Sequence, residues 1–203
     1  MKTVILANGE FPKAKTPLEI LKSADKIICC DGAVNNLLDF GLEPSLIIGD
    51  LDSVSKTIKQ KYQNIVNQVK EQNTNDLTKA VNWCVENNIL EFDILGATGK
   101  REDHSIANIS LLSQYMNKAN VRIVSDYGVF IPIKKTTSFN SYIGQQVSIF
   151  AMTPNSKITS IGLKYPLENT KLENWWSGTL NEALSNKFSL EFNDGSYIVY
   201  LLS

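Results

Sequence analysis

Short apolar segments alternate with segments of helical spacing over the first 125 residues, and this alternation restricts the fold more than any other feature. Each apolar segment is about five residues long and runs into polar residues, as buried strands do. Strands that alternate with helices predict a mostly parallel sheet with right-handed crossovers. The predicted strands are 4–7, 26–30, 45–49, 91–95 and 121–125, and the predicted helices are 34–38, 77–85 and 107–115.

The pattern changes near residue 127, where helical spacing ends and β-like runs follow one another, separated by turn-prone residues. Such a series is typical of an antiparallel domain. Within it, Asn193, Asp194 and Gly195 predict a hairpin turn. The chain therefore divides into a predicted domain over 1–126 and a second one over 127–203. The predicted strands of the second domain are 128–133, 146–152, 157–161, 187–192 and 197–202.

Charge and cysteine content argue against several classes of function. The 203 residues carry 20 Lys and Arg against 21 Asp and Glu, without a basic cluster, so we expect no nucleic-acid partner. The apolar run that starts at Val4 ends before Asn8, which is too short for a membrane span, so we expect no membrane partner. Three cysteines and one histidine, without a Cys-x-x-Cys motif, argue against zinc and favour reduced thiols in a cytoplasmic protein.

Asp50 and Asp52 directly follow a predicted strand and are the strongest functional signal of the chain. In an extended segment, residues i and i+2 point to the same side, about 7 Å apart, so both carboxylates can face one cation. Carboxylate oxygens are the ligands that a hard divalent cation such as Mg²⁺ prefers, and such a cation suggests a phosphate substrate. The alternative is a loop whose aspartates start a turn or cap the next helix.

Residues of the same character follow two other predicted strands. Asp31 follows the second strand, where it either caps the next helix or meets a nucleotide, and Gly32 lets the backbone approach a ligand closely. Asn8 and Gly9 follow the first strand in the same way. Because the residues after parallel strands gather at one edge of the sheet, we expect these side chains to share a cleft with Asp50.

Asp76 and Lys79 lie one turn apart at the start of a predicted helix, so they share one face of it. Asp76 alone is explained by the favourable interaction of a carboxylate with the helix dipole. Lys79 then either neutralises a phosphate or lies on a solvated surface.

The loop 96–103 joins a predicted strand to a helix. It is not a P-loop, because Ile94 stands where that motif has its first glycine and Arg101 stands where it has Ser or Thr. The N-terminus of a helix favours anions, and a guanidinium binds phosphate oxygens in bidentate fashion. We therefore expect Thr98, Arg101 and Asp103 to form a phosphate site, with an exposed Arg–Asp ion pair as the alternative.

Six short motifs are distributed between residues 30 and 182 of the chain. They are Cys30–Ala33 with Asn35, Gly49–Ser53, Asn75–Lys79, Gly96–Asp103, Gly162–Leu167 and Ser177–Glu182. In this order and spacing they resemble the thiamine pyrophosphokinase family. The resemblance implies an α/β domain over 1–126 that binds nucleotide and metal, with a mostly parallel sheet and flanking helices. It also implies an antiparallel β-sandwich over 127–203 that binds thiamine and forms a homodimer, with active sites at the subunit interface.

The implied activity moves the pyrophosphoryl group of ATP, the co-substrate, to the hydroxyl of thiamine, with Mg²⁺ as cofactor. The attack is in line on the β-phosphorus, and catalysis comes from positioning and charge stabilisation. Either Asp76 or Asp103 accepts the hydroxyl proton. Leu180 stands where the family usually has serine, and Asn73 and Asn75 where Asp and Thr are common; no role is assigned to Trp175 and Trp176.

Together, the residue patterns and the resemblance give a set of expected site residues. The metal ligands are Asp50, Asp52 and Asp76, and these three with Arg101 and Asp103 form the catalytic set. The expected nucleotide contacts are Asn8, Gly9, Asp31, Gly32, Asn35, Lys79, Thr98 and Arg101. The expected thiamine contacts are Gln72, Tyr165, Thr179 and Asn181.

Two alternatives from other functional classes use the same residues. The apolar strand followed by Asp-x-Asp imitates a phosphatase of the haloacid-dehalogenase type, in which Asp50 would be the nucleophile. A regulatory module that binds nucleotide or thiamine without turnover is the second alternative. The presence of both Asp50 and Asp52 argues against this second alternative, because a module that only binds its ligand has less need of a metal site.

Overall fold

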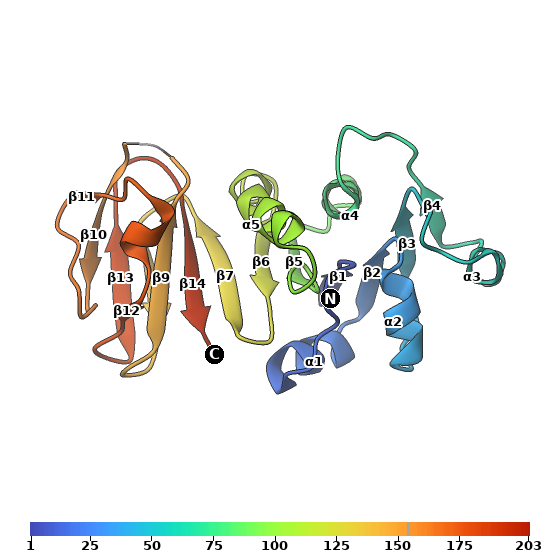
Figure 1. Cartoon of the computed structure of the whole chain (residues 1–203), viewed down its shortest axis with the longest axis horizontal. Coiled ribbons are helices and arrows are strands. Elements are labelled where there is room, and N and C mark those ends of the chain that lie inside the picture. Colours follow the sequence, from blue (N-terminus) through green and yellow to red (C-terminus); the bar gives the residue numbers. More distant parts are fainter. Residues whose placement is uncertain (154) are drawn as a thin grey trace. The chain divides into compact units, whose positions relative to one another are not determined.

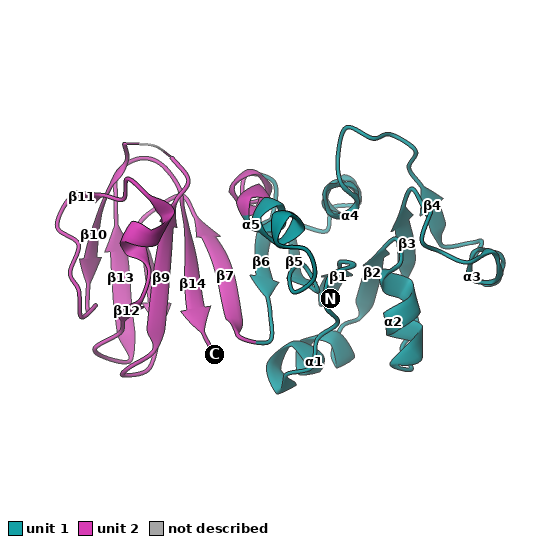
Figure 2. Cartoon of the chain, in the orientation of Figure 1, with its two compact units in different colours: residues 1–109, 118–126 teal, residues 110–117, 127–203 magenta. Residues whose placement is uncertain are grey.

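The computed structural model describes residues 1–153 and 155–203 and divides into two compact units (Figures 1 and 2). Unit 1 comprises residues 1–109 and 118–126, and unit 2 comprises residues 110–117 and 127–203. Within the described residues, no helix combines the length and the apolar composition needed to cross a membrane.

Unit 1 contains a parallel sheet with the strand order β6-β5-β1-β2-β3-β4. The central strands are rich in Ile, Val and Leu, and every residue of β1 and β3 is buried, as expected for a parallel sheet covered on both faces. The polar residues that follow these strands therefore lie at one edge. The strands are β1 (Thr3–Leu6), β2 (Lys26–Cys30), β3 (Leu46–Gly49), β4 (Val66–Gln68), β5 (Glu91–Leu95) and β6 (Asn120–Val124).

Five helices connect these strands. The helix that matters most for the site is α4, whose N-cap Asn75 accepts the backbone N–H of Thr78 at 2.9 Å. Leu77, Ala80, Val81 and Cys84 form its buried face. The first turn of α4 is thereby fixed against the sheet. The helices are α1 (Lys15–Lys22), α2 (Ala33–Asp39), α3 (Lys56–Lys61), α4 (Asp76–Glu86) and α5 (Glu102–Tyr115).

Unit 2 contains two antiparallel sheets, with the strand orders β12-β9-β14-β7 and β11-β10-β13-β8. Val147 and Ile149 of the first sheet and Phe188 and Leu190 of the second belong to one buried core, so the sheets form a sandwich. The elements are β7 (Gly128–Ile133), β8 (Thr137–Asn140), β9 (Gln146–Ala151), β10 (Lys157–Ile161), β11 (Thr170–Lys171), the 3-10 helix η1 (Trp175–Gly178), β12 (Asn181–Glu182), β13 (Lys187–Glu191) and β14 (Tyr197–Leu202).

The predicted fold class is confirmed: a mostly parallel α/β sheet is accompanied by an antiparallel sandwich. The predicted hairpin at 193–195 is wrong, because β13 and β14 belong to different sheets and this segment connects the two. Elements with little buried surface escaped prediction. No residue of α3 is buried, and no residue of β4 is fully buried, so neither segment shows an apolar period.

Candidate active site

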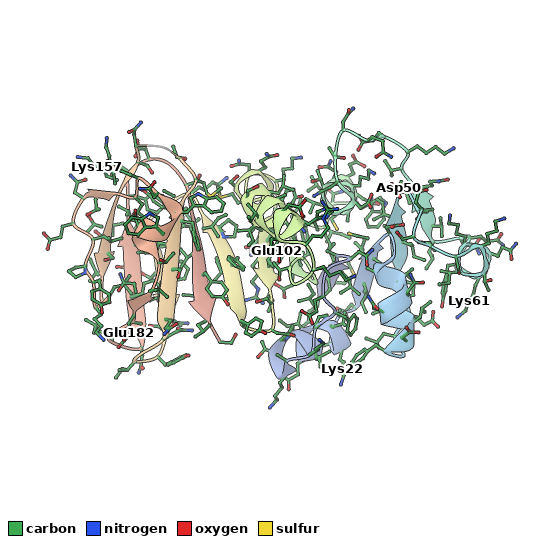
Figure 3. All side chains as sticks on the ribbon, in the orientation of Figure 1. Lys22, Asp50, Lys61, Glu102, Lys157 and Glu182 are labelled. Carbon is green, nitrogen blue, oxygen red and sulfur yellow. The ribbon has the colours of Figure 1, made fainter. Side chains whose placement is uncertain are left out.

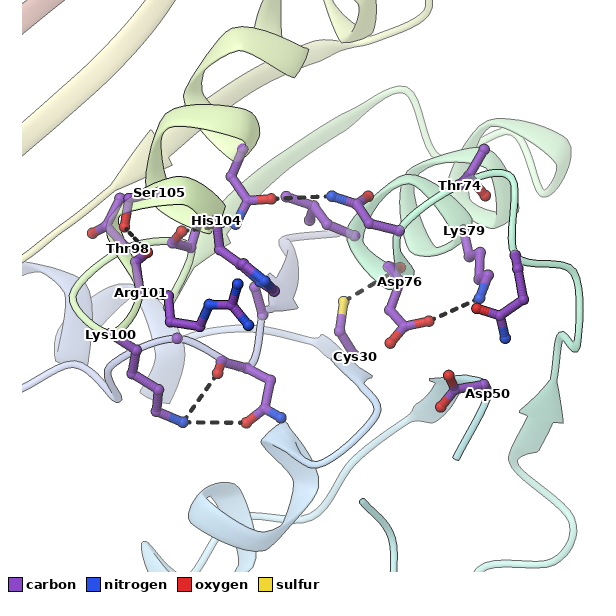
Figure 4. Close-up of a pocket in the computed structure, with 18 residues that line it drawn as sticks. Cys30, Asp50, Thr74, Asp76, Lys79, Thr98, Lys100, Arg101, His104 and Ser105 are labelled. Carbon is purple, nitrogen blue, oxygen red and sulfur yellow. Dashed lines mark hydrogen bonds and ion pairs between the residues drawn. The ribbon is translucent and has the colours of Figure 1, made fainter. Parts of the chain in front are cut away.

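A pocket of about 430 Å³ lies at the carboxyl ends of the unit 1 strands (Figure 4). Its walls come from the residues after β1 and β5, the end of β2, Asp50 after β3, and the starts of α4 and α5. Figure 3 shows Asp50 beside the end of β3. Of the predicted residues, the pocket is lined by Asn8, Gly9, Asp50, Gln72, Asp76, Lys79, Thr98 and Arg101.

Three aspartates from three different segments converge beside this pocket. Asp31, Asp50 and Asp76 each present a carboxylate oxygen, and these oxygens lie within 4.8 Å of one another. Asp31 is only 6% exposed, and its Oδ1 has no hydrogen-bond partner among the described residues. A buried carboxylate oxygen without a partner is costly unless a cation or another donor compensates it.

Gly49 leaves the space in which these carboxylates meet. A Cβ at this position would lie 3.1 Å from Asp31 Cβ and 3.1 Å from Asp76 Cγ. Its φ of 152° is also one that other residues rarely adopt. The backbone conformation therefore favours glycine at the end of β3, and any side chain there would also crowd Asp31 and Asp76.

The expected geometry of Asp50 and Asp52 is wrong, because the segment between them is not extended. Leu51 adopts a left-handed conformation with φ 68° and buries its side chain to 2% exposure. The turn directs the backbone N–H of Asp52 to Asp50 Oδ1 at 3.0 Å, and the Asp52 side chain is exposed. Asp31, expected to contact nucleotide, takes the third place in the cluster, and a metal role for Asp52 stays a prediction.

Lys79 pairs with Asp76 rather than facing solvent (Figure 4). Its ammonium lies 3.0 Å from Asp76 Oδ1, and its side chain is 4% exposed against 28% for Asp76. The surface alternative for Lys79 is therefore wrong. Its expected contact with nucleotide stays a prediction.

The loops after β1 and β5 form the opposite wall of the pocket. Gly9 donates its backbone N–H to the carbonyl of Gly96 at 2.7 Å, and a Cβ on Gly9 would lie 2.3 Å from that oxygen. Lys100 Nζ donates to the carbonyl of Asn8 at 3.0 Å. Gly9 thus permits the close approach of two loops, in keeping with its predicted place at the site.

Arg101 and Asp103 form an exposed bidentate ion pair at the start of α5. Arg101 Nε and Nη2 donate to the two Asp103 oxygens at 3.1 and 2.6 Å, and the side chains are 72% and 62% exposed. The Arg101 guanidinium holds the pKa of Asp103 below its usual value, with help from the backbone N–H of His104. The structure thus contains the exposed Arg–Asp ion pair that was the alternative to a phosphate site. A phosphate role for Arg101 stays a prediction.

Asn35 and Gly32, expected to contact nucleotide, are not among the residues that line the pocket, and they connect the loops beside it. The Asn35 amide donates to the carbonyls of Gly32 at 3.0 Å and Ser53 at 3.3 Å, so it links the loop after β2 to the loop after β3. A Cβ on Gly32 would lie 2.9 Å from Asn8 Nδ2. These contacts hold the segments that carry Asp31 and Asp52.

Sequence reasoning missed Asn108 and gave Asn75 no role in the pocket, although both line it. Asn75 Nδ2 donates to Asn108 Oδ1 at 3.2 Å, and Asn108 Nδ2 donates to the carbonyl of Ala97 at 2.8 Å. This chain of bonds joins α4, α5 and the loop after β5. The available signal was an amide residue inside the otherwise apolar face of a predicted helix.

The expected thiamine contacts are divided between the two units. Gln72 is exposed at the pocket of unit 1, whereas Tyr165, Thr179 and Asn181 belong to unit 2. Tyr165 is 59% exposed. Asn181 is buried, and its amide donates to the carbonyl and accepts the N–H of Tyr165 at 2.7 and 3.0 Å, so it fixes the backbone of that residue.

The donor set of the cluster fits a hard divalent cation. Carboxylate oxygens suit Mg²⁺, and the buried Asp31 Oδ1 has no hydrogen-bond partner in the part of the chain that the structure describes. The nearby Cys30 thiol adds no soft ligand, because burial raises its pKa well above the ordinary value and keeps the proton on sulfur. Asp31, Asp50 and Asp76 are thus the residues suited to hold Mg²⁺.

Comparison with known families identifies the chain. The family model for the thiamin pyrophosphokinase catalytic domain matches residues 18–125, and the model for the thiamin pyrophosphokinase substrate-binding domain matches residues 128–200. The chain belongs to the thiamin pyrophosphokinase family. Family membership confirms the resemblance seen in the sequence motifs.

Members of the thiamin pyrophosphokinase family are also similar along most of the chain. Thiamin pyrophosphokinase 1 of Caenorhabditis elegans is 31% identical over 185 residues, which cover 83% of this chain and 76% of that protein. Thiamine pyrophosphokinase of Bacillus subtilis is 26% identical over 181 residues, with 83% of each chain covered.

Solved structures of thiamin pyrophosphokinases share the fold. The crystal structure from Bacillus subtilis aligns with a TM-score of 0.83 at 23% identity and covers 100% of this chain and 99% of its own. The yeast enzyme aligns with a TM-score of 0.78 at 18% identity and covers 100% of this chain and 86% of its own.

Proposed function

We propose that the chain transfers the pyrophosphoryl group of ATP to the hydroxyl of thiamine and so forms thiamine diphosphate and AMP. The observation that carries this proposal is the convergence of three carboxylates on a pocket in a chain of the thiamin pyrophosphokinase family. An acidic cluster beside cationic side chains suits a substrate that brings both phosphate and a divalent cation.

Asp31, Asp50 and Asp76 are the proposed Mg²⁺ ligands. Bound Mg²⁺ would supply charge neutralisation for the phosphate oxygens of ATP. Asp52 is exposed two residues after Asp50, and we retain it as a ligand that acts once nucleotide is present. The carboxylates alone would repel ATP, so the binding of nucleotide and of metal are coupled.

Arg101 and the start of α5 are the proposed phosphate-binding groups. The exposed Arg101 guanidinium can exchange Asp103 for phosphate oxygens without a large desolvation cost. Thr98 lines the pocket on the preceding loop, and Asn8 and Gly9 line its opposite wall. These groups would hold the β-phosphorus in line with the attacking hydroxyl, and Asp76 or Asp103 would accept the proton.

Thiamine is the proposed acceptor, with Gln72 as its contact in unit 1 and Tyr165, Thr179 and Asn181 as the contacts of unit 2. We also propose that the chain forms a homodimer with active sites at the subunit interface. Exposed apolar side chains of unit 2 support an association surface, since such residues gather at interfaces. They include Ile143, Tyr165, Trp176 and Leu180, which are 73%, 59%, 74% and 74% exposed.

A cytoplasmic location is the further part of this proposal. Cys29, Cys30 and Cys84 are all buried as free thiols, which suits a reducing compartment. Burial raises the pKa values of Cys29 and Cys84 to about 12, so these thiols are protected from oxidation in the folded chain.

The comparisons support neither of the alternatives, a phosphatase or a module without turnover. Incubation with ATP, Mg²⁺ and thiamine tests the proposal directly, with both products followed by chromatography. Equal amounts of AMP and thiamine diphosphate are expected. Release of inorganic phosphate with an aspartyl-phosphate trapped on Asp50 would favour the phosphatase, and binding without any product would favour the regulatory module.

A further inference from the structure

Lys79 places a buried positive charge beside the acidic cluster. Its side chain is 4% exposed, and its ammonium lies 3.0 Å from Asp76 Oδ1. Asp76 is one of the three aspartates whose oxygens lie within 4.8 Å of one another. Because an ammonium is buried at a tolerable cost only beside an anion, Lys79 and the cluster stabilise each other.

The contact between Lys79 and Asp76 is local, because it lies within one turn of a single helix. Both residues belong to the first turn of α4, and their i,i+3 spacing puts the side chains on one face of the helix. Asn75 caps this turn through the N–H of Thr78. Asp76 is therefore oriented by its own helix, whether or not a cation is present.

Lys79 also differs from the other cationic side chains that line the pocket. Lys100 and Arg101 are exposed, so they can reach a phosphate group that enters from solvent. The ammonium of Lys79 is enclosed and already engaged by a carboxylate. Its position suits a charge that compensates the acidic cluster rather than one that binds an incoming phosphate.

We propose that Lys79 is a built-in counter-ion of the Asp31, Asp50 and Asp76 cluster, which positions Asp76 and limits the cluster to one divalent cation of moderate affinity. The proposal rests on the metal role inferred above. Three carboxylates and one ammonium carry a formal charge of −2, which a single divalent cation neutralises. Without the ammonium, the excess negative charge attracts a divalent cation more strongly.

Mn²⁺ binding without nucleotide tests this proposal, with the free ion measured by electron paramagnetic resonance. The wild-type chain is expected to bind one Mn²⁺. Lys79→Met keeps a side chain of similar length and removes the charge. Its Kd for Mn²⁺ is expected to fall about tenfold. Its melting temperature without metal is expected to drop, because the three carboxylates lose their compensating charge, and Mn²⁺ is expected to restore it.

Lys100→Met is the matched control, because it removes a cation from the same pocket at a residue that donates to Asn8 rather than to an aspartate. Its Kd for Mn²⁺ is expected to change less than threefold, on the order expected for a more distant, solvated charge. A second variant, Lys79→Gln, keeps a hydrogen-bond donor without the charge. It is expected to bind Mn²⁺ more tightly and to serve as the test if Lys79→Met does not fold.

Several results would overturn the proposal. Two Mn²⁺ ions per wild-type chain, or none at millimolar Mn²⁺, would contradict a cluster neutralised by one cation. Unchanged or weaker Mn²⁺ binding in a folded Lys79 variant would also contradict it. If such a variant showed only a raised KM for ATP, Lys79 would be a phosphate ligand.

The assay for thiamine diphosphate is independent of these measurements. A wild-type chain that binds one Mn²⁺ but forms no thiamine diphosphate would refute the proposed function and leave the role of Lys79 intact. If the wild-type chain forms the product but the Lys79 variants keep the wild-type affinity for metal, only the counter-ion role of Lys79 is refuted.

Discussion

Two ion pairs border the same pocket and differ in their exposure to water. Lys79 and Asp76 are 4% and 28% exposed, whereas Arg101 and Asp103 are 72% and 62% exposed. Solvent screens the second pair and lets it open at little cost, while the first pair cannot lose one member without leaving a charge behind. The contrast suggests a fixed charge pair at the proposed metal ligands and an exchangeable one at the proposed phosphate-binding groups.

Loss of the Asp76 carboxylate should have the largest effect on turnover and on the free energy of unfolding. Asp76→Asn takes a carboxylate from the cluster and leaves the buried Lys79 ammonium without its anion. We expect turnover to fall by about 1,000-fold or more and the free energy of unfolding to drop by about 3 kcal/mol. Urea unfolding and AMP release measure the two effects. A variant as stable as the wild type would show that the pair is not buried in solution.

Gly49→Ala should disturb the fixed pair without removing a charge. The new Cβ would lie 3.1 Å from both Asp31 Cβ and Asp76 Cγ, at a φ that alanine rarely adopts. We expect a loss of about 2 kcal/mol in the free energy of unfolding together with weaker Mn²⁺ binding. Gly41→Ala is the control, since Gly41 has a φ of 85° but open space around its Cβ, and it should lose stability with unchanged Mn²⁺ affinity.

Arg101→Met should separate activity from stability. The side chain is exposed, so the melting temperature should stay within error of the wild type. We expect kcat/KM for ATP to fall about 100-fold, because a guanidinium is lost from the developing charge on phosphate. Steady-state assays against ATP check this. An unchanged kcat/KM would mean that Arg101 only pairs with Asp103 and does not contact ATP.

The smallest effect concerns the ionisation of Asp103. Arg101 lowers the pKa of this carboxyl, so the ion pair stabilises the fold above the ordinary pKa near 3.8 and is lost as the pH falls through the lower folded value. In Arg101→Met the pKa of Asp103 should return toward the ordinary value. A carbon-detected NMR titration of the Asp103 carboxyl measures this, and equal midpoints in the two proteins would contradict the pair.

Much of the fold could be predicted from the sequence, because buried strands and helix faces leave an apolar period. β2, β5, β7, β10 and β14 have the predicted bounds. The apolar period of α5 begins five residues after its exposed start at Glu102, so only the loop 96–103 indicated where this helix begins. Chain topology also predicted that Asp31 and Asp50 would share one cleft, and their carboxylates do lie together. Asp76 was expected beside Asp50 from the family resemblance.

The finer geometry of the site could not be predicted for physical reasons. Leu51 has a left-handed backbone, and leucine gives no signal for such a conformation. The sequence therefore suggested that Asp50 and Asp52 face one cation. Lys79 looks like a surface lysine until the packing around α4 is known, because burial of a charged group depends on tertiary contacts.

Leu51 has a consequence for the way the site responds to an incoming cation. A left-handed leucine costs about 1–2 kcal/mol, and full burial of its side chain contributes about 1.5–3 kcal/mol. The apolar packing of Leu51 therefore stabilises the bend between Asp50 and Asp52. Apolar contacts carry no charge, so they are not weakened by the screening that weakens ion pairs. We therefore expect the loop that carries Asp50 to keep the same conformation before and after a cation binds.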